Sequence, residues 1–261
     1  MKPTVQCISV EHRGDVMWIT INRPELRNAI NDDVIAGISN GLDQAQTTAG
    51  VRAVVLTGAG DRAFCAGADL RPDSNIFDFD FSQPRTGYAE LLRQAVACEL
   101  PLIARVNGAC MAGGMGLLTM CDMAVAGARA KFGLPEVKVG MFPMQVAAVM
   151  QNLVLRRKFS EMCLTGEALT APEALEAGLV NYVVDDVELD AKVDWLVGRI
   201  TDKSPTAIRR GEHALRAIED MTFAQSIAFM EAQLGSLRLT KDAAEGLAAF
   251  AEKRQPIWTG Q

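Results

Sequence analysis

ARVNGACMAGGMGLLTMCDMAVA, residues 104–126, places a glycine-bearing turn and an apolar run between two β-rich segments. The segments Leu102–Val106 and Asp122–Ala126 predict strands. Gly113 and Gly114 let the chain turn sharply and let a ligand approach the backbone. A helix that begins at this pair would direct its positive end at that ligand. Taken alone, such a turn of small residues is more often a packing device, so it is weak support for a binding site.

Predicted strands alternate with helices in the same way through the rest of the first 200 residues. Further strands are predicted at Thr4–Val10, Val16–Ile21, Val51–Thr57 and Val180–Val184, and a helix opens near Asn31. The apolar stripe of that helix, at helical spacing, consists of Val34, Ile35, Ile38, Leu42 and Ala45. Strands that alternate with helices predict an α/β fold.

The chain beyond residue 200 is different, because the strand signal stops there. Ser204, Thr222 and Thr240 each begin a predicted helix. The apolar positions of these helices need a partner surface, either the core or another subunit. We therefore predict an α/β core over residues 1–200 and a helical oligomerisation region over residues 201–261.

The composition of the chain disfavours several classes of function. The net charge is −6, and we interpret the nearest basic group, Arg209, Arg210 and Arg216, as a solvated helix face instead of a nucleic-acid surface. No run of 18 apolar residues occurs and the N-terminus lacks a signal-peptide pattern, so no membrane contact is expected. The 6 cysteines form no CxxC pair, which predicts reduced core thiols and a cytoplasmic protein.

The chain has few histidines that could take part in catalysis or bind a metal. The chain has 2 histidines, His12 in a polar N-terminal segment and His213 on a charged helix. A histidine metal site and a catalytic triad both need more histidine than this in a suitable place. We therefore expect no metal site.

Two further segments supply groups that could carry chemistry. Residues 63–70, AFCAGADL, form a second small-residue turn after a β-rich run, and neither turn matches a P-loop or a G-x-G-x-x-G motif. In residues 131–140, KFGLPEVKVG, Pro135 fixes the backbone that presents Glu136 among apolar neighbours. Burial there would raise the pKa of Glu136 toward the range useful for proton transfer. The alternative is that Glu136 caps a turn or pairs with Lys138.

Six segments together resemble the crotonase superfamily, the enoyl-CoA hydratase/isomerase family. In chain order they are INRPELRNAI, VVLTGAGDRAFCAGADL, ARVNGACMAGGMGLLTMCDMAVA, KFGLPEVKVG, LTGEALTAPEALEAGLVNYVV and EGLAAFAEKRQP, from Ile21 to Pro256. The resemblance implies a spiral of ββα units followed by a helical trimerisation region, assembled as a homotrimer or homohexamer. It also implies an acyl-CoA or enoyl-CoA thioester as the partner, with coenzyme A entering as part of the substrate and no other cofactor.

The resemblance assigns roles to individual positions. The backbone N–H groups of Ala68 and Gly113 match the pair that holds the thioester oxygen and stabilises the enolate formed during the reaction. Phe250 and Lys253 match positions that reach the nucleotide from an adjacent element or subunit, although a solvated tail is the alternative for Lys253. The positions expected to contact coenzyme A are Arg27, Ala66, Ala68, Phe250 and Lys253.

The residue at position 116 bears on which of two reactions the chain is expected to catalyse, hydration or isomerisation. Hydratases of this family use two glutamates to hold one water, and Gly116 stands where the first belongs while Glu136 matches the second. One base is enough to move a proton from C2 to C4 of a 3-enoyl-CoA, so isomerisation is favoured over efficient hydration. The substrate pocket is expected to contain Met144, Tyr88 and Gly116. The segment Pro72–Tyr88 could supply a second acid or a hydrogen-bond donor from Asp73, Asp78, Asp80 or Tyr88.

Two alternatives stay open. The first keeps the fold and assigns another acyl-CoA reaction, such as thioester hydrolysis, decarboxylation or dehalogenation. Dehalogenation commonly needs an aspartate nucleophile and a nearby histidine, and His12 and His213 lie outside all six segments. The second is a protein that binds acyl-CoA without turning it over, which Gly116 allows and Glu136 argues against.

Overall fold

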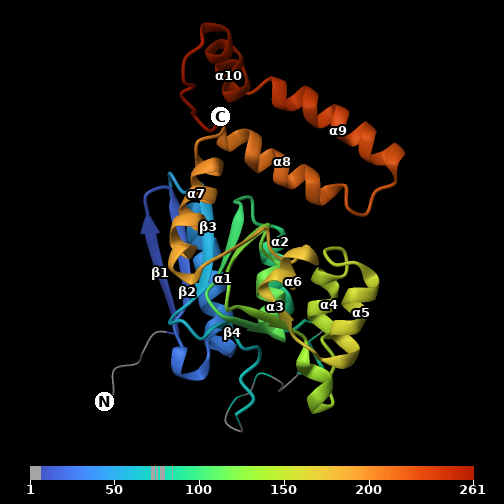
Figure 1. Cartoon of the computed structure of the whole chain (residues 1–261). Helices are drawn as coiled ribbons and strands as arrows, with labels where there is room; N and C mark the ends of the chain where they lie inside the picture. Colours follow the sequence, from blue (N-terminus) through green and yellow to red (C-terminus); the bar gives the residue numbers. More distant parts are fainter. Residues whose placement is uncertain (1–6, 72–73, 75, 77–79, 84) are drawn as a thin grey trace.

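A six-stranded sheet forms the centre of the computed structural model, which describes residues 7–71, 74, 76, 80–83 and 85–261. The strand order is β1-β2-β3-β5-β7-β10 (Figure 1). β1 and β2 form an antiparallel hairpin, and the other neighbouring strands run parallel. The bounds are Ile8–Arg13 (β1), Val16–Ile21 (β2), Ala53–Gly58 (β3), Leu102–Val106 (β5), Met123–Gly127 (β7) and Tyr182–Val184 (β10).

A smaller, four-stranded sheet has the order β4-β6-β8-β9. β3 and β4, β5 and β6, and β7 and β8 follow one another in the chain, so each successive pair places one strand in each sheet before a helix follows. This repetition is the predicted spiral of ββα units, and the fold class is confirmed. The bounds are Ala63–Cys65 (β4), Gly87–Val96 (α2), Ala109–Met111 (β6), Gly113–Thr119 (α3), Lys131–Gly133 (β8), Pro135–Val139 (η2), Met144–Met150 (α4) and Leu169–Thr170 (β9).

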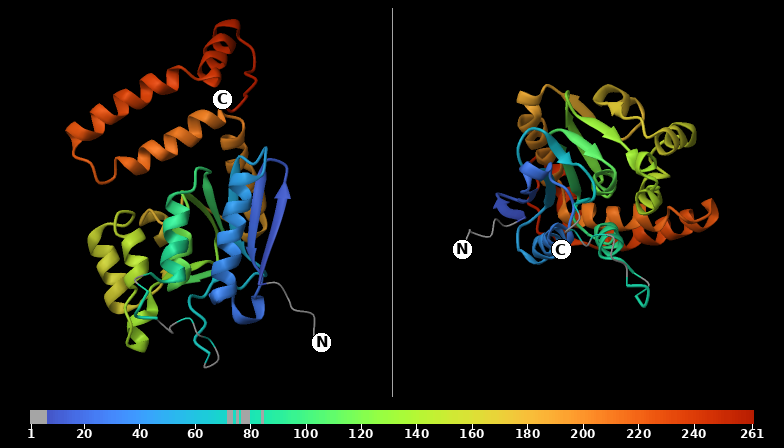
Figure 2. Two further views of the ribbon diagram at one scale, coloured as in Figure 1. Left: turned by 180° about the vertical axis from the view of Figure 1, so that it is seen from behind. Right: turned by 90° about the horizontal axis from the view of Figure 1, so that it is seen from below.

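The main sheet is covered on both faces. Every residue of β3 is buried, as expected for a central parallel strand between two helical layers. One face packs against α1 (Asp32–Thr47) and the other against α7 (Leu189–Thr201) (Figures 1 and 2). The five apolar positions predicted for the first helix are all buried in α1. Asn31 caps this helix by accepting a hydrogen bond from the N–H of Val34 at 3.0 Å.

The strands of the main sheet follow the predicted bounds to within two residues except at β1, whereas the four strands of the smaller sheet were not predicted. β2 and β5 match the predicted bounds, whereas β1 continues to Arg13, beyond the predicted end at Val10. The added residues are polar and exposed, because β1 is an edge strand whose outer side faces water. Gly14, with φ of 58°, then makes the tight return to β2.

The C-terminal helices project from one end of the sheet (Figures 1 and 2). They are α8 (Pro205–Ala217), α9 (Phe223–Arg238) and α10 (Lys241–Glu252), and they follow α5 (Arg156–Thr165), α6 (Ala171–Glu176) and η3 (Asp186–Glu188) in the chain. α9, which is described over its whole length, contains no buried residue. Large exposed apolar side chains in this region include Phe223, Ile227, Leu234, Leu239, Leu247 and Phe250. The helical nature of the region is confirmed, and its role in assembly stays a prediction.

Arg216 is not part of a solvated face, so that interpretation was wrong. Its guanidinium lies 2.7 Å from the carboxylate of Asp122 and donates to the carbonyl oxygens of Val96 and Cys98, both at 2.6 Å. Only 17% of the Arg216 side chain is exposed. The periodicity of α8 marked this position as polar but could not indicate that the end of α2, the segment after it and the residue before β7 supply acceptors. Arg216 therefore fixes α8 to the core.

All six cysteines are free thiols, and Cys65, Cys98, Cys110 and Cys163 are buried, as predicted. Burial raises the pKa of the Cys65 thiol to about 12. Over the described part of the chain, no helix has the length and apolar character needed to cross a membrane.

Asp242 ties the chain end to α8 and α10. Its carboxylate accepts hydrogen bonds from the N–H groups of Thr259 (2.8 Å) and Gly260 (3.1 Å) and from the hydroxyl of Ser204 (2.8 Å). Burial by itself would raise the pKa of Asp242, but these hydrogen bonds outweigh it and hold the pKa at about 2.

We expect Asp242→Asn to lower the free energy of unfolding by about 2 kcal/mol at pH 7, because buried donors lose a charged acceptor. The native pKa lies below the ordinary value of 3.8, so this stabilisation is present above that pH and is lost as the pH falls towards 2. Urea unfolding over this pH range measures the difference. Glu252→Gln on α10, which removes an exposed carboxylate, is the matched control. Equal effects of the two variants at pH 7 would contradict the assignment.

Candidate active site

A cavity of about 730 Å³ opens where the strands of the smaller sheet end. β4, β6 and β8 pair in parallel, so the segments that follow them meet at one edge of this sheet. These segments place six residues on the cavity wall, namely Ala66, Ala68, Ala112, Gly113, Pro135 and Glu136. The structure therefore brings the two predicted backbone donors and the predicted acid/base to a single cavity.

Two glycine-bearing turns touch each other at this edge. Gly67 has φ of 95°, and a Cβ built on it would lie 2.7 Å from the Cβ of Ala112 and 3.3 Å from the nitrogen of Gly113. Only glycine allows this approach. Within the described residues, neither the N–H of Ala68 nor that of Gly113 donates a hydrogen bond to another part of the chain. Two backbone donors on adjacent turns are thus left available to a ligand oxygen.

Ala112, directly before Gly113, has an unusual backbone conformation. Its φ of 50° and ψ of −123° lie in a region that L-residues rarely occupy, at a cost of about 1–3 kcal/mol. The neighbouring hydrogen bonds hold it there, since its N–H donates to the carbonyl of Gly133 and its carbonyl accepts from Met115, both at 2.9 Å. This conformation turns the chain from β6 into α3 and presents Gly113 to the cavity.

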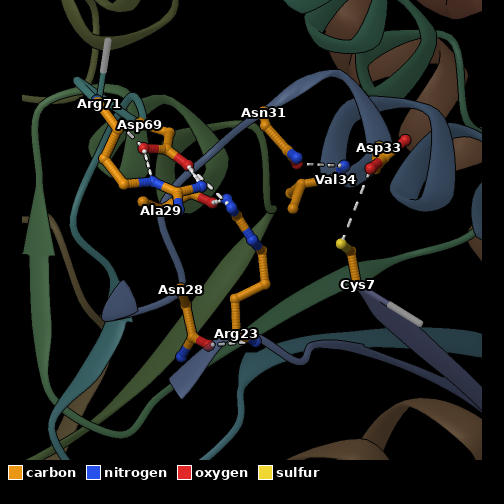
Figure 3. A network of polar contacts seen from close by, with 9 residues as sticks. All are labelled: Cys7, Arg23, Asn28, Ala29, Asn31, Asp33, Val34, Asp69 and Arg71. Carbon is orange, nitrogen blue, oxygen red and sulfur yellow. Dashed lines mark hydrogen bonds and ion pairs between the residues drawn. The ribbon is translucent and has the colours of Figure 1, made fainter. Parts of the chain in front are cut away.

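A buried ion pair supports the other turn from behind (Figure 3). The guanidinium of Arg23 lies 2.8 Å from the carboxylate of Asp69, with 7% and 4% of the two side chains exposed. Arg23 also donates to the carbonyl of Ala29 at 2.6 Å. Arg71 contacts the same carboxylate at 2.9 Å from a more exposed position. Because Asp69 directly follows Ala68, this network fixes the backbone that carries the Ala68 N–H.

Asn28 connects this network to the start of β4. Its side-chain amide donates to the carbonyl of Ala63 at 2.7 Å, and its amide oxygen accepts from the N–H of Arg23 at 3.1 Å. Arg27 and Asn28 both have positive φ, and the Arg27 carbonyl accepts from the N–H of Ala66 at 3.0 Å. Arg27 is exposed and lies beside the first turn, although it is not on the cavity wall.

Glu136 is the cavity residue with the clearest chemical signature. Its Oε2 atom is buried and, within the described part of the chain, has no hydrogen-bond partner. Burial raises the pKa of this carboxyl above its ordinary value of 4.5. Lys138 does not neutralise it, because Lys138 pairs with Glu167 at 2.9 Å. An unpartnered buried carboxylate oxygen on a cavity wall favours a role in proton transfer.

The predicted pocket residues lie in different places. Tyr88 and Met144 line the cavity, and Tyr88 belongs to the first turn of α2. Gly116 is buried in α3 and is not among the residues of the cavity wall, because the hydroxyl of Tyr88 covers it. Of the aspartates proposed as a second acid, Asp80 is at the cavity, while Asp73 and Asp78 lie outside the described residues.

Phe250 and Lys253 are not brought to this cavity within one chain. Phe250 is 85% exposed, and α10 packs against α8 and α9 at the end of the molecule remote from β4 (Figure 1). Their proposed contact with the nucleotide therefore requires another subunit.

Sequence reasoning missed three groups that shape the site: Arg23, Asn28 and Asp69. All three stood inside the quoted segments, and a signal was available, because charged or amide residues in apolar surroundings are buried only when they are paired. The ion pair of Arg23 with Asp69 joins positions 46 residues apart in the chain, which no local pattern indicates.

The spiral of ββα units, with the cavity at the ends of β4, β6 and β8, defines a crotonase-fold enzyme. The family model described as enoyl-CoA hydratase/isomerase matches residues 11–261. The chain belongs to the enoyl-CoA hydratase/isomerase family, and it is an enzyme of this family that acts on CoA thioesters.

Individual relatives cover nearly the whole chain. It is 34% identical over 257 residues to the 2,3-dehydroadipyl-CoA hydratase of Escherichia coli K12, covering 97% of this chain and 98% of the relative. It is 30% identical to the (E)-benzylidenesuccinyl-CoA hydratase of Thauera aromatica, with 97% and 99% covered. The crystal structure of an enoyl-CoA hydratase from Bacillus anthracis is similar with a TM-score of 0.90 and 30% identity, with 98% of this chain and 100% of that chain covered.

Proposed function

We propose that this protein isomerises 3-enoyl-CoA to the conjugated 2-enoyl-CoA, with Glu136 as the only acid/base. The observation that carries the proposal is the buried, unpartnered Oε2 atom of Glu136 on the cavity wall. Among the described residues, the two other acidic side chains at the cavity are weaker candidates. Asp32 is exposed. Asp80 accepts hydrogen bonds from the hydroxyl and N–H of Ser82, and these hold its pKa below the ordinary value.

In this mechanism the substrate carbonyl oxygen lies between the N–H groups of Ala68 and Gly113. The Glu136 carboxylate removes a proton from C2, and the electron pair moves into the thioester, giving a dienolate that the two N–H groups stabilise. The protonated carboxyl then returns the proton at C4, so the double bond moves into conjugation and the carboxylate is restored. Burial of Glu136 suits the first step, because a raised pKa makes the carboxylate a stronger base toward the C2 proton.

Hydration is the second candidate, and the names of the relatives favour it. The relatives from Escherichia coli and Thauera aromatica are both named as hydratases. Hydration of a 2-enoyl-CoA adds water across the double bond and gains from two carboxylates that share that water. Gly116 leaves one of these positions without a carboxylate, which should cost something like the 10²–10⁴-fold that one acid/base supplies.

Purified protein should be assayed in parallel with crotonyl-CoA and a 3-enoyl-CoA, following the absorbance of the conjugated thioester. We expect the 3-enoyl substrate to gain conjugation at a rate at least 10²-fold above the loss of crotonyl-CoA. A faster loss of crotonyl-CoA would favour hydration instead. Release of free thiol, or turnover of neither substrate, would favour hydrolysis or the binding-protein alternative.

We further propose that the protein assembles as a trimer or hexamer through α8–α10 and resides in the cytoplasm. Six free cysteines are consistent with a reducing compartment. The exposed apolar side chains of α9 and α10 supply a surface suited to subunit contacts. Assembly would allow Phe250 and Lys253 to reach the coenzyme A bound to a neighbouring subunit, while Ala66 and the backbone near Arg27 contact it within the chain.

A further inference from the structure

Tyr88 is held in place above α3 from two sides. Its hydroxyl donates a hydrogen bond to the carbonyl of Gly113 at 2.5 Å. Thr86, which caps α2, accepts from the N–H of Ala89 at 3.3 Å and from the side chain of Gln145 at 2.6 Å. Gln145 belongs to α4, so α2, α3 and α4 together fix the direction of the phenol. The ring then lines the cavity, with its hydroxyl over the first turn of α3.

The hydroxyl of Tyr88 occupies the space that a side chain at position 116 would need. A Cβ built on Gly116 would lie 2.1 Å from the Tyr88 oxygen, 3.2 Å from its Cζ atom and 3.4 Å from a methyl group of Val146. A separation near 2 Å is far inside van der Waals contact. Tyr88 in this position therefore requires glycine at position 116, and any larger residue there would have to displace the phenol.

The phenol cannot perform the chemistry of a carboxylate. Burial raises its pKa well above the ordinary value of 10.0, and the nearby thiols and the charge of Glu136 add to this effect. The hydroxyl stays neutral, and its proton is already engaged by the Gly113 carbonyl. It can neither accept a proton from a water nor hold a water as an anion would.

We propose, resting on the function proposed above, that Tyr88 and Gly116 form a specificity-determining pair. The phenol fills the volume from which a second acidic side chain could hold a water opposite Glu136. The site is thereby restricted to moving a proton within the acyl chain. Tyr88 acts as a wall and as a positioning residue for the Gly113 peptide.

A stability cycle tests the pair without any substrate. Gly116→Ala should lower the melting temperature by about 5 °C when Tyr88 is intact, because the added methyl group overpacks the contact. In the Tyr88→Phe variant the same substitution should lower the melting temperature clearly less, since the Tyr88 oxygen, 2.1 Å from the added Cβ, is absent. An equal fall in melting temperature with Tyr88 and with Phe at position 88 would contradict the proposed contact between Tyr88 and Gly116. This measurement stays readable whichever reaction the enzyme performs.

An activity cycle tests the consequence. Gly116→Glu alone should gain no hydration of crotonyl-CoA, whereas Gly116→Glu combined with Tyr88→Ala should hydrate about 10²-fold faster than Tyr88→Ala. The proposal would be wrong if Gly116→Glu gained hydration of crotonyl-CoA with Tyr88 intact. It would also be wrong if the double variant gained no hydration while it still isomerised the 3-enoyl-CoA. Rapid hydration by the wild type would overturn both the proposed function and the restricting role, even where the stability cycle shows coupling.

Discussion

Glu136→Gln is expected to lower the isomerisation rate about 10²–10⁴-fold, because the amide cannot accept the C2 proton. The side chain keeps its shape, so KM should change little and the loss should fall on kcat. Single-substrate kinetics with a 3-enoyl-CoA measure both constants. Glu167→Gln is the matched control, since Glu167 is an exposed carboxylate that pairs with Lys138 beside Glu136. Unchanged turnover in Glu136→Gln would remove Glu136 from the mechanism.

The pH profile provides a second measure of the same group. Catalysis begins with the carboxylate form, so the rate should fall as the pH drops through the pKa of Glu136. Burial raises that pKa above its ordinary value of 4.5, and the acidic limb of the profile should therefore lie above pH 4.5. In Glu136→Gln the residual activity should lose this limb. A limb that persists in the variant would belong to another group.

The main components of the site could be predicted from sequence because they are local. Each glycine-bearing turn follows a strand directly, and Pro135 precedes Glu136 in the chain, so neighbouring residues define each piece. The order of the six segments then implied the spiral that brings the pieces together. The same locality explains why the buried stripe of α1 was predicted residue by residue.

Groups whose role depends on distant partners could not be predicted in this way. Tyr88 was predicted to lie in the substrate pocket together with Gly116, but the close approach of its hydroxyl to Gly116 arises only when α2 brings the phenol over α3. Arg216 was interpreted as a surface residue, because its contacts with Asp122 and two backbone carbonyls form only in the folded chain. In each case the deciding contact joins segments that are remote in sequence.

The second large effect is expected from substitution of Asp69, the buried carboxylate behind the turn that carries Ala68. Asp69→Asn would leave the guanidinium of Arg23 without its anion in a place where little water reaches. Removing one partner of a buried ion pair typically costs about 3–5 kcal/mol, so we expect a loss of that size in the free energy of unfolding. The kcat for a 3-enoyl-CoA should fall as well, because the Ala68 N–H loses the support that positions it.

Arg71→Gln separates the buried contact from the exposed one. Hydrogen bonds from Arg71 hold the pKa of Asp69 well below its usual range, against the effect of burial and with further help from Arg23. Since 48% of the Arg71 side chain is exposed, water can replace its contact, and we expect Arg71→Gln to cost less than about 1 kcal/mol. Urea unfolding at pH 7 compares the two variants. Because the native pKa of Asp69 is depressed, its stabilisation is present above pH 3.8 and weakens as the pH falls, so the cost of Asp69→Asn should shrink in acid. If Arg71→Gln were as damaging as Asp69→Asn, the exposed arginine, and not Arg23, would hold the turn.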